Sequence, residues 1–252
     1  MKKILFLLLI VANVGHAQDT SDSFYSANDL YKNEKFEEAI QLYQKIETEG
    51  FISSELYYNL GNSYYKLNKV GPSVYYYEKS LKLNPLNEDV KNNLIFAKRL
   101  ALDNIEELPK TILQKVNKNY LQKLSYNQWA IVVIIFSVLG SLLFLLFYFA
   151  STSSKKRFYF ATSSISFILL LASFFITYNQ YLRSKNNKEA IVFAKKTEVR
   201  NAPTLNSEEV FTLHEGTKVF VLDGVDDWKK IRLADGKLGW IIADEIKLLN
   251  NF

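Results

Sequence analysis

The sequence predicts a multidomain membrane protein with an all-α repeat domain, a two-helix transmembrane hairpin and a small all-β barrel, in that order. Three observations lead to this prediction. Residue types recur at a spacing of 34 positions over residues 20–87, and two uncharged apolar runs follow at residues 130–149 and 158–178. After residue 188 the chain changes to short alternating segments, which are typical of β-strands.

Residues 1–17 have the features of a cleaved signal peptide. A basic start (Lys2, Lys3) precedes a short apolar run, and the small residues Gly15 and Ala17 stand at the −3 and −1 positions before Gln18. The apolar run is too short for a comfortable transmembrane helix. An uncleaved anchor is the alternative, and both interpretations send the chain from Gln18 onward across the membrane.

The predicted repeat domain spans residues 18–105, with copies at 20–53 and 54–87 and a capping helix at 88–103. The positions that recur are Phe24, Asn28, Tyr31, Lys32, Lys35, Ala39 and Tyr43, matched by Tyr58, Asn62, Tyr65, Lys66, Lys69, Ser73 and Tyr77. Small residues such as Gly61 are expected to let the two helices of a copy approach closely, with Tyr43 and Tyr77 filling the space between them.

The second copy resembles the tetratricopeptide repeat, a family with this period. The resemblance rests on Tyr57, Leu60, Gly61, Tyr64, Ser73, Tyr77, Ser80 and Pro85. It implies a concave groove for a protein partner, lined by Phe24, Asn28, Tyr31, Lys32, Tyr58, Asn59, Asn62, Tyr65, Lys66 and Asn93. The asparagines match part of a peptide-clamping pattern, but Phe24 and Tyr58 stand where a clamping lysine would be. The alternative is that these side chains only pack and solvate an exposed face.

The two apolar runs predict membrane spans at residues 129–150 and 158–179, joined by a cytoplasmic loop at 151–157. Each run is long enough to span the ~30 Å hydrocarbon core of a bilayer. Inserting a charged side chain at the centre of such a helix would cost about 2.5–3.5 kcal/mol of free energy, and neither run contains one. Tyrosines and Trp129 flank the spans, as in interfacial belts. Small residues at Ser137, Ser141, Thr162 and Ser166 predict that the spans pair. A buried helical hairpin in a soluble core is the alternative.

Positive charge is concentrated beside the spans. Residues 106–189 hold 10 basic and 3 acidic residues, a net charge of +7, whereas residues 18–105 and 190–252 carry −3 and −1. Within the juxtamembrane segment 106–128, apolar residues recur at helical spacing between lysines, which indicates either an amphipathic helix in the lipid head-group region or a solvated linker helix. The lipid bilayer is therefore an expected partner, and a nucleic acid is not.

The predicted β module covers residues 190–250, with strands at 191–193, 210–213, 218–222, 228–233, 238–242 and 246–249. Its motifs resemble the bacterial SH3 domain: 198–203, 213–219, Trp228 with Ile231, and 236–241. The resemblance implies a small SH3-like barrel, and many members bind cell-wall peptides. A candidate ligand face comprises Arg200, Asp226, Asp227 and Arg232. We expect Trp228 and Trp240 to fill the barrel core.

Catalysis and metal binding are not expected. The chain has no cysteine, and its two histidines are His16, in the predicted signal peptide, and His214. No glycine-rich phosphate loop and no metal-ligand spacing is present, so we predict a non-enzyme without a cofactor.

The order of modules resembles the BatE-type proteins of aerotolerance operons. The resemblance implies an inner-membrane stress complex with von Willebrand A-domain membrane proteins and a MoxR-type ATPase, with both soluble domains periplasmic. The leading hypothesis is a scaffold that binds protein segments through its repeat groove. Peptidoglycan binding or sensing through the SH3 module is the second hypothesis, and an accessory subunit that regulates a hydrolase supplied in trans is the third.

Overall fold

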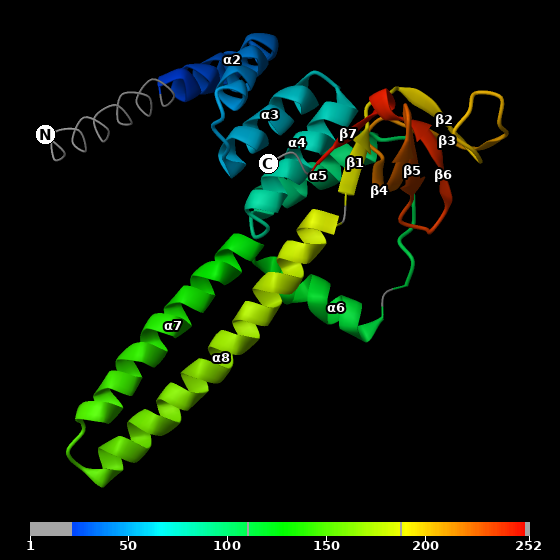
Figure 1. The fold of residues 1–252 in the computed structure, drawn as a ribbon. Helices are drawn as coiled ribbons and strands as arrows, with labels where there is room; N and C mark the ends of the chain where they lie inside the picture. Colours follow the sequence, from blue (N-terminus) through cyan, green and yellow to red (C-terminus); the bar gives the residue numbers. More distant parts are fainter. Residues whose placement is uncertain (1–21, 110, 187, 250–252) are drawn as a thin grey trace, which may run out of the picture. The chain divides into compact units, whose positions relative to one another are not determined.

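The computed structural model describes residues 22–109, 111–186 and 188–249. The predicted signal peptide lies outside these residues. The chain divides into two compact units: one joins the helical repeats, residues 87–108 and the C-terminal sheet, and the other is built on residues 109–188, with the short stretch 84–86 assigned to it. Figure 1 shows the order of the elements along the chain.

The repeat domain is all α-helical, as the sequence predicts. A helix over residues 22–32 is followed by α2 (Phe36–Thr48), α3 (Ser54–Lys66), α4 (Val70–Leu83) and α5 (Glu88–Leu100). The turn inside each copy repeats as well, because Glu34 and Asn68 both adopt positive φ, at 62° and 55°. The Ser53 and Asn87 side chains cap α3 and α5 by accepting from the backbone N–H three residues on.

Close approach of α3 and α4 depends on Gly61. The rings of Tyr43 and Tyr77 are almost completely buried, at 0% and 1% exposure. A Cβ atom at Gly61 would lie 2.6 Å from Cδ1 of Tyr77, far inside normal contact distance. The Ser73 hydroxyl donates to the Gly61 carbonyl over 3.0 Å, which closes the same contact. The expected role of these small residues is therefore confirmed for the second copy.

Gly61→Ala should destabilise the repeat domain by about 1–3 kcal/mol, because the rigid Tyr77 ring must move to admit the methyl group. Thermal unfolding of the full chain in detergent, followed by circular dichroism, measures this. Lys66→Ala, at an exposed position of the same helix, is the matched control and should leave the transition within about 0.5 kcal/mol. Equal midpoints for the two variants would contradict the packing described.

The second unit contains α6 (Ile112–Asn119), the short helix η1 (Leu121–Lys123), α7 (Tyr126–Phe149) and α8 (Ser153–Asn186). Helices α7 and α8 are long and apolar enough to cross a membrane, and only 0% and 11% of their most apolar windows are buried within the protein. Core helices of a soluble protein would be mostly buried, so the alternative of a soluble helical hairpin is not supported.

Serine hydroxyls join the two apolar helices. Ser166 on α8 donates to the Phe136 carbonyl over 3.0 Å, and Ser163 donates to the Gly140 carbonyl over 3.3 Å. The predicted pairing of the spans is therefore confirmed. The predicted loop at 151–157 is too long, because α8 already begins at Ser153 and includes Lys155–Arg157 in its first turns. A helix start costs little here, since no residue in this stretch breaks a helix.

The C-terminal module is an antiparallel sheet of seven strands in the order β3-β2-β6-β5-β4-β1-β7. The strands are β1 (Lys188–Val192), β2 (Lys196–Arg200), β3 (Glu209–His214), β4 (Lys218–Val225), β5 (Trp228–Arg232), β6 (Leu238–Ile242) and β7 (Ile246–Leu248). Strand β2 is absent from the sequence prediction, which gave residues 198–203 as a motif of the bacterial SH3 resemblance and placed no strand there. Its charged side chains alternate with the buried Thr197 and Val199, so it is a strand with one apolar face.

Strand β1 contributes to two hydrophobic cores at once. Ala190 and Val192 belong to the core of the sheet, whereas Ile191 points the other way and belongs to the core of the helical repeats. Successive side chains of a strand point to opposite faces, so one strand serves both cores. Tyr75 on α4 completes the junction, because its hydroxyl donates to the Leu248 carbonyl over 3.3 Å.

Among the described residues, four ion pairs lie at the same junction. Glu78 on α4 pairs with Lys98 at 2.7 Å and with Lys218 of β4 at 3.0 Å. Lys218 also pairs with Glu189 of β1 at 3.1 Å, and Glu189 pairs with Lys82 at 3.1 Å. Burial alone would raise the pKa of Glu78, but the ammonium groups of Lys218 and Lys98 outweigh it and lower the pKa to about 2.

The chain between α5 and α6 also attaches to the sheet. The Asp103 carboxylate accepts from the backbone N–H and the Nδ1 of His214, at 2.7 and 2.8 Å, and from the Thr217 hydroxyl. Ile105 packs against the core of the sheet. Leu108 N–H donates to the Ala234 carbonyl over 3.2 Å. Residues 103–108 therefore fold with the β module, although sequence patterns assign them to the repeats or to the membrane approach.

Acid should weaken the junction. Because the pKa of Glu78 is lowered on folding, its ionisation stabilises the protein above about pH 4.5, and this contribution is lost as the pH falls toward 2. Glu78→Gln should therefore lower the free energy of unfolding by up to about 3 kcal/mol at neutral pH and by little near pH 2.

Denaturant titrations at several pH values measure this difference. Glu38→Gln, which alters an exposed pair with Lys35, is the matched control and should show a small difference at every pH. If the difference in the free energy of unfolding between the wild type and Glu78→Gln does not depend on pH, the assigned role of Glu78 is contradicted.

Candidate binding surfaces

The ten predicted groove residues define the repeat face, which comprises Phe24, Asn28, Tyr31, Lys32, Tyr58, Asn59, Asn62, Tyr65, Lys66 and Asn93. In the first copy Asn28 is the centre of a hydrogen-bonded group. Its Oδ1 accepts from the Tyr43 hydroxyl at 2.6 Å and from Asn59 Nδ2 at 2.8 Å. Asn28 thus links its own copy to the first helix of the next.

The second copy repeats the same group 34 residues later. Asn62 Oδ1 accepts from the Tyr77 hydroxyl at 2.6 Å and from Asn93 Nδ2 at 2.9 Å, while Asn93 Nδ2 also donates to the Tyr58 hydroxyl at 3.1 Å. We call the two groups together the asparagine ladder. It brings five of the predicted residues into contact: Asn28, Asn59, Asn62, Asn93 and Tyr58.

The ladder leaves amide groups available for a ligand. Each asparagine offers two N–H donors and one oxygen acceptor. Within the described residues, no hydrogen bond occupies the Nδ2 groups of Asn28 and Asn62 or the Oδ1 atoms of Asn59 and Asn93. The repeat face therefore offers both amide donors and amide acceptors on side chains that hydrogen bonds hold in place.

The remaining residues of the repeat face divide into aromatic and basic groups. Phe24, Tyr31, Tyr58 and Tyr65 are half-buried and pack against the repeat core. Burial raises the pKa of Tyr31, so its hydroxyl stays protonated at neutral pH. Lys32 and Lys66 are exposed, and Lys32 pairs with Asp29 at 3.3 Å. No side chain in this set forms a buried cationic clamp.

Asn62 contributes to the stability of the repeat domain as well as to the repeat face. Removing its side chain would leave the hydroxyl of the buried Tyr77 without its acceptor, which costs about 1–3 kcal/mol. Asn62→Ala would therefore change the stability of the repeat domain as well as its surface. Tyr65, which is half-buried and outside the ladder, is the better position for a binding test.

A double-mutant cycle with Asn62→Ala and Tyr77→Phe tests the ladder. We expect each single variant to have a lower free energy of unfolding than the wild type. The loss in the double variant should be smaller than the sum of the two single losses, with a coupling energy of about 0.5–3 kcal/mol. Denaturant unfolding of the four proteins measures it. Asn68→Ala is unsuitable as a control because of its positive φ, whereas Asn92→Ala on exposed α5 surface should not couple to Tyr77→Phe. Strict additivity for the Asn62 and Tyr77 variants would contradict the bond.

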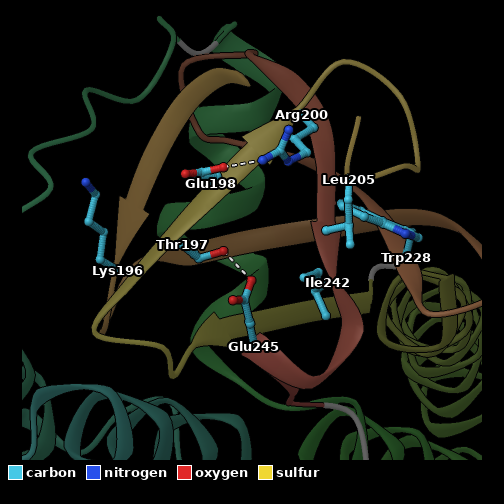
Figure 2. A pocket seen from close by; sticks show the side chains of 8 residues that line it. All are labelled: Lys196, Thr197, Glu198, Arg200, Leu205, Trp228, Ile242 and Glu245. Carbon is cyan, nitrogen blue, oxygen red and sulfur yellow. Dashed lines mark hydrogen bonds and ion pairs between the residues drawn. The ribbon is translucent and has the colours of Figure 1, made fainter. Parts of the chain in front are cut away.

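The sheet carries a cavity of about 270 Å³, shown in Figure 2. The residues that line it are Lys196, Thr197, Glu198, Arg200, Leu205, Trp228, Ile242 and Glu245. Glu198 and Arg200 form an ion pair, Arg200 also donates to the Ser207 carbonyl, and Thr197 donates to Glu245. The cavity thus combines an apolar part, made by Leu205, Trp228 and Ile242, with polar side chains that include the Glu198–Arg200 ion pair.

The predicted ligand face of the β module is only partly brought together. Arg200 lines the cavity, but Asp226, Asp227 and Arg232 are not among its lining residues. Asp226 lies in the exposed turn between β4 and β5, with φ at 48°, and the Arg232 guanidinium lies 5.7 Å from the centre of the Phe220 ring. Residues on successive turns and strands need not share a face, which sequence spacing alone does not reveal.

The expectation that Trp228 and Trp240 fill the barrel core is wrong. Both are half-buried, and the core of the sheet consists of smaller side chains such as Val199, Ile231 and Ile241. Trp228 lines the cavity instead, and Trp240 lies under the Lys230 ammonium at 5.9 Å. The side chains that pack against this core are Ile105, Phe211, Ile246 and Leu248, and neither tryptophan is among them.

Comparisons with known proteins match two parts of the chain. Residues 54–87 match the tetratricopeptide repeat, and residues 195–247 match the bacterial SH3 domain. A search of curated proteins gave no match. The matched modules suggest protein–protein interaction for the repeats and cell-wall binding for the sheet, and both are typically non-catalytic. In the described part of the chain, no group of side chains is arranged to hold a metal ion.

Proposed function

We propose that the protein is a non-enzymatic scaffold of the bacterial inner membrane that binds protein segments through its repeat face. Both soluble modules would lie in the periplasm, within a Bat-type aerotolerance or stress complex. The observation that carries this proposal is the asparagine ladder, which holds unpaired amide donors and acceptors in register over two successive copies.

The chemistry of the repeat face favours an extended, uncharged peptide segment. An extended backbone presents alternating N–H and C=O groups. An asparagine amide can bind either group, because its NH₂ donates hydrogen bonds and its oxygen accepts them. Half-buried tyrosines supply apolar contact area and are common at binding surfaces. The absence of a buried cationic clamp among the described residues disfavours a C-terminal carboxylate as the ligand, because an unpaired carboxylate is costly to desolvate.

The hairpin supports a membrane location for this binding. Helices α7 and α8 are long and apolar enough to cross a bilayer, and the exposed share of their surface suits lipid contact. A membrane-bound partner follows naturally, and the resemblance to BatE-type proteins names membrane proteins with von Willebrand A domains as the first partners to test.

Tyr65→Ala should reduce capture of the partner at least tenfold, because it removes contact area from the repeat face without touching the ladder. Crosslinking in native membranes followed by quantitative mass spectrometry of copurified proteins measures the capture. Tyr25→Ala is the matched control, because Tyr25 is 65% exposed and lies outside the repeat face.

The unfolding midpoint of Tyr25→Ala should match the wild type, and that of Tyr65→Ala should fall modestly, because the Tyr65 ring packs against the repeat core, while the protein stays folded at the assay temperature. If Tyr65→Ala captures the same proteins in the same amounts, or if Tyr25→Ala loses them equally, the repeat face is not the binding surface.

Peptidoglycan binding by the sheet is the second candidate function, and the cavity beside Trp228 favours it. Cosedimentation of the full chain with purified peptidoglycan in detergent tests it, with Trp228→Ala expected to abolish binding and Trp240→Ala, outside the cavity, expected to preserve it. The isolated segment 190–252 is a poor reagent, because Ile191 and Leu249 belong to the repeat core and would be exposed. Failure of the wild type to sediment would remove this function.

A further inference from the structure

Helix α6 presents an apolar strip that is exposed among the described residues of its own unit. A capping box formed by Thr111 and Gln114 starts the helix. Ile112, Val116 and Tyr120 then follow at intervals of four residues, which places them on one side of the helix. Their exposures are 80%, 44% and 67%, far above those of apolar residues in a folded core.

The end of α6 is fastened to the hairpin. The Leu121 carbonyl in η1 accepts from Trp129 Nε1 of α7 at 2.9 Å and from Gln180 Nε2 of α8. Trp129 stands at the start of the first apolar run and Gln180 just after the second. Because both helices bond the same carbonyl, η1 lies at the open end of the hairpin, where the chain enters and leaves the apolar zone.

The charge of this segment has a single sign. Residues 110–123 contain four lysines and no acidic residue, and the Lys123 ammonium lies 6.0 Å from the ring centre of Tyr120. A helical period of about 100° per residue puts Lys115 beside the apolar strip rather than within it. Lysine side chains beside an apolar strip are long enough to reach a polar layer while their methylene groups stay in contact with apolar surface.

We propose that α6 docks on the surface of an anionic lipid leaflet, with Ile112, Val116 and Tyr120 among the acyl chains and the lysines among the head groups. The fastened end of α6 places the helix at the level of the leaflet, the apolar strip fits the acyl boundary, and the lysines complement anionic lipid. This inference goes beyond the proposed function and holds for either orientation of the hairpin.

The full chain, which has no cysteine, allows a direct test. We would place an environment-sensitive fluorophore at Val116→Cys, and at Asn117→Cys as the matched control about 100° around the helix. The proteins are reconstituted in vesicles of phosphatidylcholine alone or with one quarter phosphatidylglycerol. With phosphatidylglycerol we expect a blue shift and protection from an aqueous quencher at position 116, and quenching at position 117.

A charge variant tests the role of the lipid head groups. Lys115→Gln/Lys118→Gln/Lys123→Gln should lower the docked-to-undocked ratio by roughly fivefold per lysine. Lys69→Gln/Lys195→Gln/Lys237→Gln, which removes three exposed lysines outside this segment, should leave it unchanged.

Three results would overturn the proposal. Quenching of position 116 in every vesicle means that α6 is solvated. Equal protection with and without phosphatidylglycerol means that the lysines do not recognise anionic lipid. Protection that rises with the protein-to-lipid ratio means that a second copy, not the leaflet, covers the strip.

Discussion

A buried carboxylate shared by two lysines holds the soluble part of this protein together. Glu78 projects from a repeat helix and meets Lys218 of the sheet and Lys98 of α5. An isolated charge in such a place would be strongly destabilising, and only the facing ammonium groups make its burial tolerable. Because Glu78 and Lys218 come from different modules, separating the modules would break the Glu78–Lys218 pair and the Lys82–Glu189 pair.

The same junction explains how two helical repeats persist without a third. A repeat solenoid needs about three units before it buries a continuous core. Here Ile191 and Leu249 from the sheet enter the repeat core, and Gly71 at the start of α4 donates its N–H to Glu215 at 3.1 Å. The sheet therefore acts as the cap that a terminal repeat requires, while α5 covers the other available surface. This arrangement would suit the scaffold role proposed above, because a binding face on a rigid body loses less conformational freedom when a ligand binds.

Sequence reasoning was strongest where a pattern is local and periodic. The 34-residue spacing predicted the paired helices and the Gly61 contact, and the uncharged runs predicted α7 and α8. Sequence reasoning was weakest where a residue contacts a partner that lies far away in the chain. Glu78 and Lys218 look like solvated surface charges in the sequence, and β1 looks like an ordinary strand with one buried face. Strand β2 was overlooked because three of its five residues are charged, and Trp228 was assigned to the core on size alone.

The packing of the repeats on the sheet can be measured with one engineered disulfide. A Cβ atom at position 71 would lie 3.4 Å from Cβ of Glu215, close to the separation found in disulfides, and the chain has no other cysteine. Gly71→Cys/Glu215→Cys should therefore oxidise within one molecule, with a loss of two hydrogens by intact mass and no free thiols. Gly71→Cys/Lys237→Cys should stay reduced under the same conditions. Two persistent free thiols in the first variant, or equal oxidation of the second, would contradict the junction.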